Sequence, residues 1–194
     1  QACKGDRGVV LAAVRQNAIA LQWAAESFRR DPEKVLAVVE QNGCALRYAS
    51  ATCRSNPRIV LAAVRRDGVA LRSAAEDCRC DREIVLAAVS QTWRALEFAT
   101  DPANGDREVV MTAVKQNWQA LEYAARTCRN DAEIVLDAVQ QNGQALCLAE
   151  GSCRSDFEIV LVAVQQDADA LQWASRACRS CRSIVLAAAQ CDGK

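Results

Sequence analysis

The chain has 194 residues, with 24 Lys and Arg, 24 Asp and Glu, and no His, so its formal net charge is zero. A neutral balance argues against strong non-specific binding to nucleic acid or to an anionic membrane, because both need a basic excess. No apolar run approaches the roughly 18 residues of a membrane span, so we expect a soluble chain.

A period of 25 residues runs through the whole sequence. The pair Ala-Leu recurs at this spacing from Ala20 to Ala170, and an Asp or Asn recurs from Asp6 to Asp156. A fixed period of this size indicates one small unit stacked on copies of itself. We therefore predict an all-α fold, an α-solenoid of about seven and a half helix-turn-helix repeats that forms a single domain over residues 1–194.

The first element of each repeat is predicted to be a helix. The apolar stretch Ile134–Leu136 looks like a strand, and the repeat length would also suit a leucine-rich repeat. However, Asp31 and Asn56 each precede a proline, which is the pattern of a helix N-cap followed by its first residue. Glutamate in the first turn agrees with the helix dipole, and the Asn ladder of leucine-rich repeats is absent. In the fourth unit we expect this helix over about Arg82–Gln91, buried on several sides.

A second helix is predicted after a break at Asn or Asp followed by Gly, as at Gly43. In the first unit its apolar residues are spaced i, i+1, i+4 and i+8, at Ala20, Leu21, Ala24 and Phe28. This spacing forms one stripe, which indicates an amphipathic helix with one face in water. Two short helices are not stable alone, so stacking must supply the burial.

The residues of the repeat resemble a known family. The pattern Asp-x-Glu-Ile-Val-Leu-x-Ala-Val-x-Gln-Asn-Gly-x-Ala-Leu-x-Tyr-Ala is similar to the helical repeat of the domain of unknown function 4116 family. It occurs at Asp81–Val89, Asp106–Ala124, Asp131–Ala149 and Asp156–Ala174. The resemblance implies an α-helical array and, from the family's distribution, a protist source, dinoflagellate algae especially. It brings no catalytic residues to this chain.

The two ends of the chain fall inside repeats. The sequence starts at Gln1 rather than Met and ends at Lys194 partway through a unit, so we expect truncation or processing at both ends. Together with the algal distribution that the resemblance implies, this start favours an organelle such as the chloroplast. The compartment is expected to be intracellular and reducing.

Most of the 11 cysteines share one position of the repeat. Phe28 and Ala103 occupy the same position in other units, which indicates a buried apolar site. Disulfides along this column are not expected, because stacked helices lie roughly 8–10 Å apart and a disulfide needs Cα atoms within about 7 Å. We interpret the column as structural thiols. Its members are Cys3, Cys53, Cys78, Cys128, Cys153 and Cys178.

Neither a cofactor nor a metal is predicted, although one alternative stays open. Cys178 and Cys181 have the CxxC spacing of metal and redox sites, and Cys191 lies nearby in sequence. A thiol-based metal or redox protein is therefore one alternative function.

Catalysis is not expected. Without His, the usual general base and most hydrolytic triads are missing. The glycines mark turns rather than a phosphate loop, and the carboxylates occupy cap positions that a structural role explains.

Positions that vary between repeats are the candidates for contacting a partner. Two such columns fall on the outer side of the predicted second helix, and at the turn Trp93 and Trp118 replace the Gly or Ala of other units. The alternative for the tryptophans is that each covers the core of the neighbouring repeat. From the two columns we select Arg47, Arg72, Arg94, Glu97, Gln119 and Glu122.

The last helix has no second helix to cover it. Its apolar residues, Ile184 and Leu186 among them, are predicted to dock on a partner or on a further part of the same chain.

These patterns favour a non-catalytic scaffold for protein–protein interaction, a structural or linker subunit of a larger assembly. The other alternative is an RNA-binding array that uses a basic column at the end of each unit. A structural role also explains that column, because basic residues complement the dipole at the end of a helix and the Asp caps that follow. The neutral net charge makes nucleic acid the less favoured partner. The column contains Lys4, Arg29, Arg54, Arg79, Arg129, Arg154 and Arg179, with Asn104 as its exception.

Overall fold

The computed structural model describes residues 4–191, and every regular element within them is helical. The predicted all-α helical repeat is therefore confirmed. The chain divides into two compact units, one up to Ala103 and one from Asn104 onward. A single domain over residues 1–194 stays a prediction. Cys3 lies outside the described residues.

Each complete repeat has three parts. A long α-helix is followed by a 3-10 helix, labelled η, and then by one short helical turn. The long helices are α1 (Arg7–Gln16), α3 (Pro32–Val39), α5 (Pro57–Arg66), α7 (Arg82–Gln91), α8 (Arg107–Gln116), α10 (Ala132–Gln141), α11 (Phe157–Gln166) and α13 (Arg182–Cys191). The 3-10 helices that follow them are η2 (Ala18–Trp23), η3 (Gly43–Tyr48), η4 (Gly68–Ser73), η5 (Trp93–Phe98), η7 (Trp118–Tyr123), η8 (Gly143–Cys147) and η10 (Ala168–Trp173). The short turns are α2 (Glu26–Arg30), α4 (Ala51–Arg54), α6 (Glu76–Arg79), η6 (Ala103–Gly105), α9 (Arg126–Arg129), η9 (Gly151–Ser155) and α12 (Arg176–Arg179).

The long helices begin where the sequence predicts. The helix α7 spans Arg82–Gln91, and the side chain of Asp81 accepts a hydrogen bond from the backbone N–H of Ile84 at 3.0 Å. Asn56 caps α5 in the same way, with Pro57 as the first helical residue. An N-cap of this kind satisfies a backbone donor that has no partner inside the helix.

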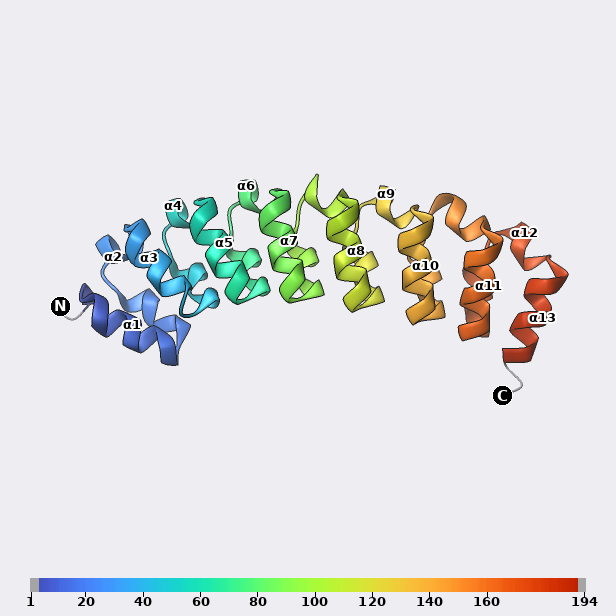
Figure 1. The fold of residues 1–194 in the computed structure, drawn as a ribbon, viewed down its shortest axis with the longest axis horizontal. Coiled ribbons are helices and arrows are strands. Elements are labelled where there is room, and N and C mark those ends of the chain that lie inside the picture. Colours follow the sequence, from blue (N-terminus) through green and yellow to red (C-terminus); the bar gives the residue numbers. More distant parts are fainter. Residues whose placement is uncertain (1–3, 192–194) are drawn as a thin grey trace. The chain divides into compact units, whose positions relative to one another are not determined.

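Within each unit the long helices lie side by side (Figure 1). The order is α1, α3, α5 and α7 in the first unit and α8, α10, α11 and α13 in the second. Valines and alanines of these helices, together with the leucine of each Ala-Leu pair, form the core, and Val85 and Leu96 are fully buried. No polar or charged side chain is buried within residues 4–191. None of the helices in that range has both the length and the apolar character that crossing a bilayer requires.

The second segment of the repeat is not the single helix that the sequence predicts. In the first repeat η2 and α2 are separated by Ala24 and Ala25, whose ψ angles of 157° and 146° are far from helical values. The predicted apolar stripe still faces inward, because Leu21, Ala24 and Phe28 are buried. The periodicity therefore identified the correct inner face but the wrong element.

A hydrogen bond between repeats accounts for this interruption. The backbone N–H just after each 3-10 helix donates to a backbone carbonyl at the end of the preceding repeat, over 2.8–3.1 Å. A continuous helix would use that N–H internally and lose the bond to the neighbouring repeat. The pairs are Ala25 to Lys4, Ser50 to Arg29, Ala75 to Arg54, Thr100 to Arg79, Ala125 to Asn104, Glu150 to Arg129 and Ser175 to Arg154.

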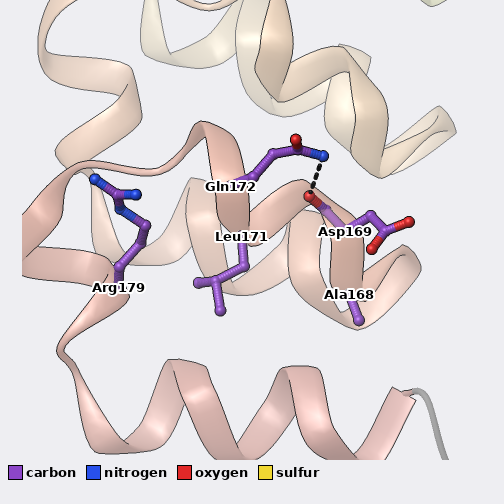
Figure 2. Close-up of a pocket in the computed structure, with 5 residues that line it drawn as sticks. All are labelled: Ala168, Asp169, Leu171, Gln172 and Arg179. Atoms are coloured by element: carbon purple, nitrogen blue, oxygen red, sulfur yellow. Dashed lines mark hydrogen bonds between the residues drawn. The ribbon is translucent and has the colours of Figure 1, made fainter.

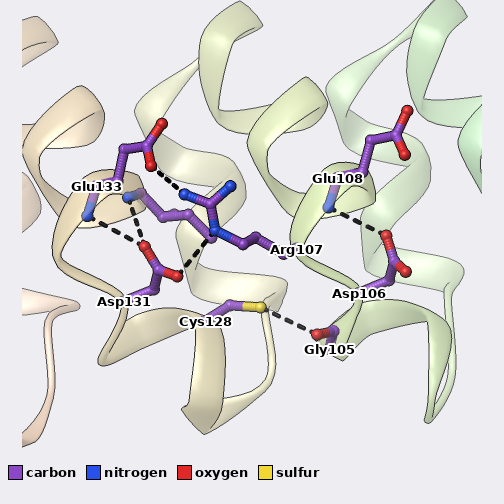
Figure 3. Close-up of polar contacts among 8 residues, drawn as sticks. Gly105, Asp106, Arg107, Glu108, Cys128, Asp131 and Glu133 are labelled. Atoms are coloured by element: carbon purple, nitrogen blue, oxygen red, sulfur yellow. Dashed lines mark hydrogen bonds and ion pairs between the residues drawn. The ribbon is translucent and has the colours of Figure 1, made fainter.

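Side chains add further links between adjacent repeats. In the second unit Arg107 reaches from α8 to Asp131, at 3.1 Å, and to Glu133 at the start of α10 (Figure 3). The thiol of Cys128 donates to the carbonyl of Gly105, at 3.2 Å, also across the repeat boundary. Arg107 is about half exposed, so this ion pair contributes little to stability beyond orienting the two helices.

Glycine at the start of the 3-10 helix allows close packing rather than a left-handed turn. Neither Gly43 nor Gly143 has a positive φ, whereas a Cβ on Gly143 would lie 2.3 Å from the carbonyl oxygen of Ala163 in the next repeat. The same contact for Gly43, with Ala63, would be 2.4 Å. Glycine is needed here because the backbone of the following repeat occupies the space of a side chain.

Candidate functional site

The predicted contact residues of the two variable columns are all exposed to solvent. Arg47, Arg72, Arg94 and Glu97 lie on η3, η4 and η5 of the first unit, and Gln119 and Glu122 lie on η7 of the second. The alanine and leucine between them in each 3-10 helix are buried, as Ala45 and Leu46 show. One segment thus supplies both the core and a variable surface. Whether these residues contact a partner stays a prediction.

The two tryptophans are half-buried rather than open to solvent. Trp118 begins η7, which packs against α10, and its backbone N–H donates to the side chain of Gln141 at 2.9 Å. Gln141 in turn donates to the carbonyl of Val114 on α8, at 2.7 Å. The guanidinium of Arg94 stacks over the ring of Trp93, 5.3 Å from its centre. This environment favours the interpretation that Trp118 covers the next repeat.

At the last helix the prediction is wrong for one residue. Ile184 is fully buried and cannot contact a partner, because the helical period turns it toward α11. Leu186 and Val185 are the exposed large apolar residues of α13, with 51% and 41% of their surface accessible.

Most side chains of the basic column are only partly accessible to solvent. The arginines at 29, 54, 79, 129 and 154 are half-buried, and their Nε atoms at positions 29, 54, 79 and 129 have no hydrogen-bond partner. In the second unit two of these side chains have internal partners. Arg129 pairs with Glu150 at 2.7 Å, and Arg154 donates to the carbonyls of Ala149 and Cys147 at 2.7 and 2.8 Å.

In the first unit, the space between η3 and η4 holds a pocket of about 440 Å³. Three arginines line it: Arg47 and Arg72 from the variable column and Arg54 from the basic column. The sequence placed Arg54 only in the basic column. It did not show that the stacking of adjacent repeats brings Arg54 close to Arg47 and Arg72. A comparison of the two columns across neighbouring repeats would have indicated that these arginines lie close together.

A second pocket, of about 490 Å³, occupies the corresponding place on η10 (Figure 2). Asp169, Gln172 and Arg179 contribute its polar side chains, and Gln172 donates to the backbone carbonyl of Asp169 at 3.0 Å. With one acid and one base, this pocket carries no net charge from its lining side chains. The concentration of arginines therefore distinguishes the first pocket from the second.

The cysteine column is buried as predicted. Cys53, Cys78, Cys128, Cys153 and Cys178 are at most 5% exposed, and all the described cysteines are free thiols. Several of these thiols donate to a backbone carbonyl of the preceding repeat, as Cys53 does to Arg29. Burial raises the pKa of Cys78, Cys128 and Cys153 above the ordinary value of a thiol. These features support structural thiols.

Cys181 differs from the rest of the thiols. It occupies the position of the Asp cap, and hydrogen bonds from Ser183 and from backbone N–H groups lower the pKa of its thiol. Its CxxC partner Cys178 is buried and donates to the carbonyl of Ser155 at 3.4 Å. Among residues 4–191 no three His, Cys, Asp or Glu side chains are grouped so that they could hold a metal ion.

Cys44 is exposed, yet its thiol is held in the protonated form. It donates to the carboxylate of Asp67 in the next repeat at 2.7 Å, and this bond together with partial burial raises the pKa of Cys44 to about 11. Gln144 makes the equivalent bond to Asp167, at 2.6 Å, so the contact belongs to the repeat rather than to the thiol.

We expect Asp67→Asn to make Cys44 more reactive. The amide oxygen can still accept from the N–H of Val69, which Asp67 caps at 3.0 Å, but the negative charge that opposes the thiolate is lost. Alkylation of Cys44 by iodoacetamide near pH 8 should become about tenfold faster, with site-by-site rates from mass spectrometry. Cys181 should react first in both proteins, and an unchanged Cys44 rate would contradict this explanation.

The repeat is shared with a known family. Residues 6–52, 56–102, 106–152 and 131–179 match the family model described as Domain of unknown function (DUF4116). Comparison with curated proteins and comparison with solved structures each found no match.

Proposed function

The chain belongs to the DUF4116 family of tandem repeats, and from this premise we propose that it is a non-catalytic scaffold that binds other proteins. The proposal rests on 3-10 helices in which constant residues are buried and variable residues are exposed. In η3, η4, η5 and η7 the alanine and leucine are buried, whereas the residues of the two variable columns are exposed, as Leu46 and Arg47 illustrate. A constant core with a variable surface is the arrangement that binding solenoids use.

Protein is favoured over RNA as the partner. Phosphate backbones are bound by many accessible cations, and affinity scales with their number. In the second unit, by contrast, Arg129 and Arg154 are engaged by a carboxylate and by carbonyls of the same chain. The charge in one exposed variable column also changes sign between adjacent repeats, from Arg72 to Glu97. Mixed charge of this kind suits a protein surface with its own pattern of charges.

The proposal is tested by capture from an extract of the source organism, with and without ribonuclease. We expect a protein bound in stoichiometric amount by the wild type, in a ribonuclease-resistant manner. The variant Arg47→Glu, Arg72→Glu, Arg94→Glu should lose most of this protein, because it reverses three exposed charges of the variable columns.

The matched control is Arg58→Glu, Arg65→Glu, Arg66→Glu. It reverses the same number of charges on exposed residues of α5, outside the variable columns, and should retain the partner. Circular dichroism checks that both variants fold. Recovery of RNA alone, or equal loss of the bound protein in both variants, would contradict the proposal.

A further inference from the structure

The arginine pocket between η3 and η4 has the composition of an anion-binding site. Arg47, Arg54 and Arg72 line it, and no acidic side chain does so. The carboxylate of Asp67 accepts hydrogen bonds from Cys44, which lines the pocket, and from the N–H of Val69. Three guanidinium groups at one hollow repel one another unless an anion lies between them.

The guanidinium groups are held in place without being neutralised. Arg47 stacks on the ring of Tyr48 at 5.2 Å, and Arg72 stacks on Phe98 at 5.8 Å, each distance measured to the ring centre. The Nε of Arg54 is buried and makes no hydrogen bond. Within residues 4–191, none of the three side chains forms an ion pair. The three guanidinium groups therefore keep their positive charge without a carboxylate partner in the described part of the chain.

The other repeats do not combine these charges. In all the remaining repeats, the column that holds Arg47 and Arg72 has Gln, Glu or Cys. In the next repeat Glu97 follows Arg72 in this column, so an acidic residue stands where the pocket has its second arginine. Only the second and third repeats bring two arginines of this column together with one of the basic column.

In the second unit one arginine of the basic column, Arg129, binds a carboxylate. There the carboxylate of Glu150 contacts Arg129 at 2.7 Å and Arg126 at 2.5 Å. The residue equivalent to Glu150 beside Arg54 is Ala75. The backbone proves the equivalence, because Ala75 donates its N–H to the carbonyl of Arg54 as Glu150 does to that of Arg129. Arg54 thus occupies the position of an arginine whose carboxylate partner is missing from its own chain.

We propose that the pocket formed by Arg47, Arg54 and Arg72 receives the carboxylate of a glutamate or aspartate from an acidic segment of a partner protein. This inference rests on the proposed scaffold function and adds the chemistry of its partner. Guanidinium groups recognise carboxylates through paired charge-assisted hydrogen bonds. A single pocket, followed by Glu97 in the same column of the next repeat, fits a short acidic segment better than a nucleic acid, which needs a continuous basic track.

The test measures the affinity of a short fluorescein-labelled peptide with adjacent glutamates, by fluorescence anisotropy at low ionic strength. Binding to the wild type should be lost when the glutamates are replaced by glutamines. The variant Arg47→Gln, Arg72→Gln should bind at least about tenfold more weakly, because two charge-assisted contacts are removed. The control Arg65→Gln, Arg66→Gln removes the same charge from the end of α5 and should stay within about twofold of the wild type.

A third variant introduces the missing carboxylate into the chain itself. Ala75→Glu should place a carboxylate beside Arg54 as Glu150 does beside Arg129, and should therefore block the peptide while the protein remains folded. Equal weakening in the pocket and control variants, or unchanged binding in Ala75→Glu, would overturn the proposal. Tighter binding of single-stranded oligouridylate or of inorganic phosphate, lost in the same pocket variant, would overturn a protein carboxylate as the ligand.

The two proposals can fail separately. If the wild type and the pocket variant capture the same partner protein equally well, the pocket assignment fails and the scaffold stands. If neither captures a protein, the scaffold fails.

Discussion

Replacing Leu146 with alanine is expected to lower the free energy of unfolding of the second unit by about 3–5 kcal/mol. Leu146 is fully buried, and its helix η8 packs against both α10 and α11. Truncation removes apolar burial and leaves a cavity, because the long helices on either side are fixed by their own caps and contacts. Urea denaturation followed by circular dichroism measures the change.

Leu171 offers a matched control in the same column. It lines an open pocket and is only half-buried, so Leu171→Ala should cost clearly less than Leu146→Ala. Equal losses at the two positions would contradict the assignment of Leu146 to the core. A larger loss at Leu171 would do so as well.

Gly143→Ala is the second substitution with a large expected effect, a destabilisation of about 1–3 kcal/mol. The new Cβ would lie 2.3 Å from the carbonyl oxygen of Ala163, a contact that forces α11 away from η8. The cost arises from overpacking, since Gly143 does not have a positive φ. Thermal and urea unfolding of the variant measure it.

Gly105→Ala is the matched control, because it adds the same methyl group in the same unit. Its Cβ would meet the side-chain Cβ of Ala125 at 3.3 Å, which a small movement relieves. We expect it to change stability by less than about 0.5 kcal/mol. A destabilisation of Gly105→Ala as large as that of Gly143→Ala would show that the repeat contact is not the cause.

The first helix of the repeat could be predicted from sequence because its signals are local. The Asp81 cap, the acidic first turn and the apolar run act within a dozen residues, and α7 has the predicted bounds. The buried cysteine column was also predictable, since a position that accepts Cys, Phe or Ala has no polar role. The same reasoning identified the exposed variable residues, such as Arg47.

The second segment was mispredicted because a contact between repeats overrides local propensity. Ala24 and Ala25 are strong helix formers, so the sequence predicts that the helix continues through them. The N–H of Ala25 instead bonds to Lys4 in the preceding repeat, and nothing in the side chains signals this. The arginine pocket was not predicted because neither column by itself indicates it; the stacking of adjacent repeats brings residues of the two columns together.

The bond between repeats has a further consequence for how such a chain evolves. It joins two backbone atoms, so it survives whichever side chains stand there, and the donors include Ala, Ser, Thr and Glu while the acceptors include Lys, Arg and Asn. A repeat that is duplicated or deleted as a whole leaves every donor facing an acceptor of the same geometry. The length of the array can therefore change by whole units while individual surface positions, such as those around Arg54, acquire new ligands independently.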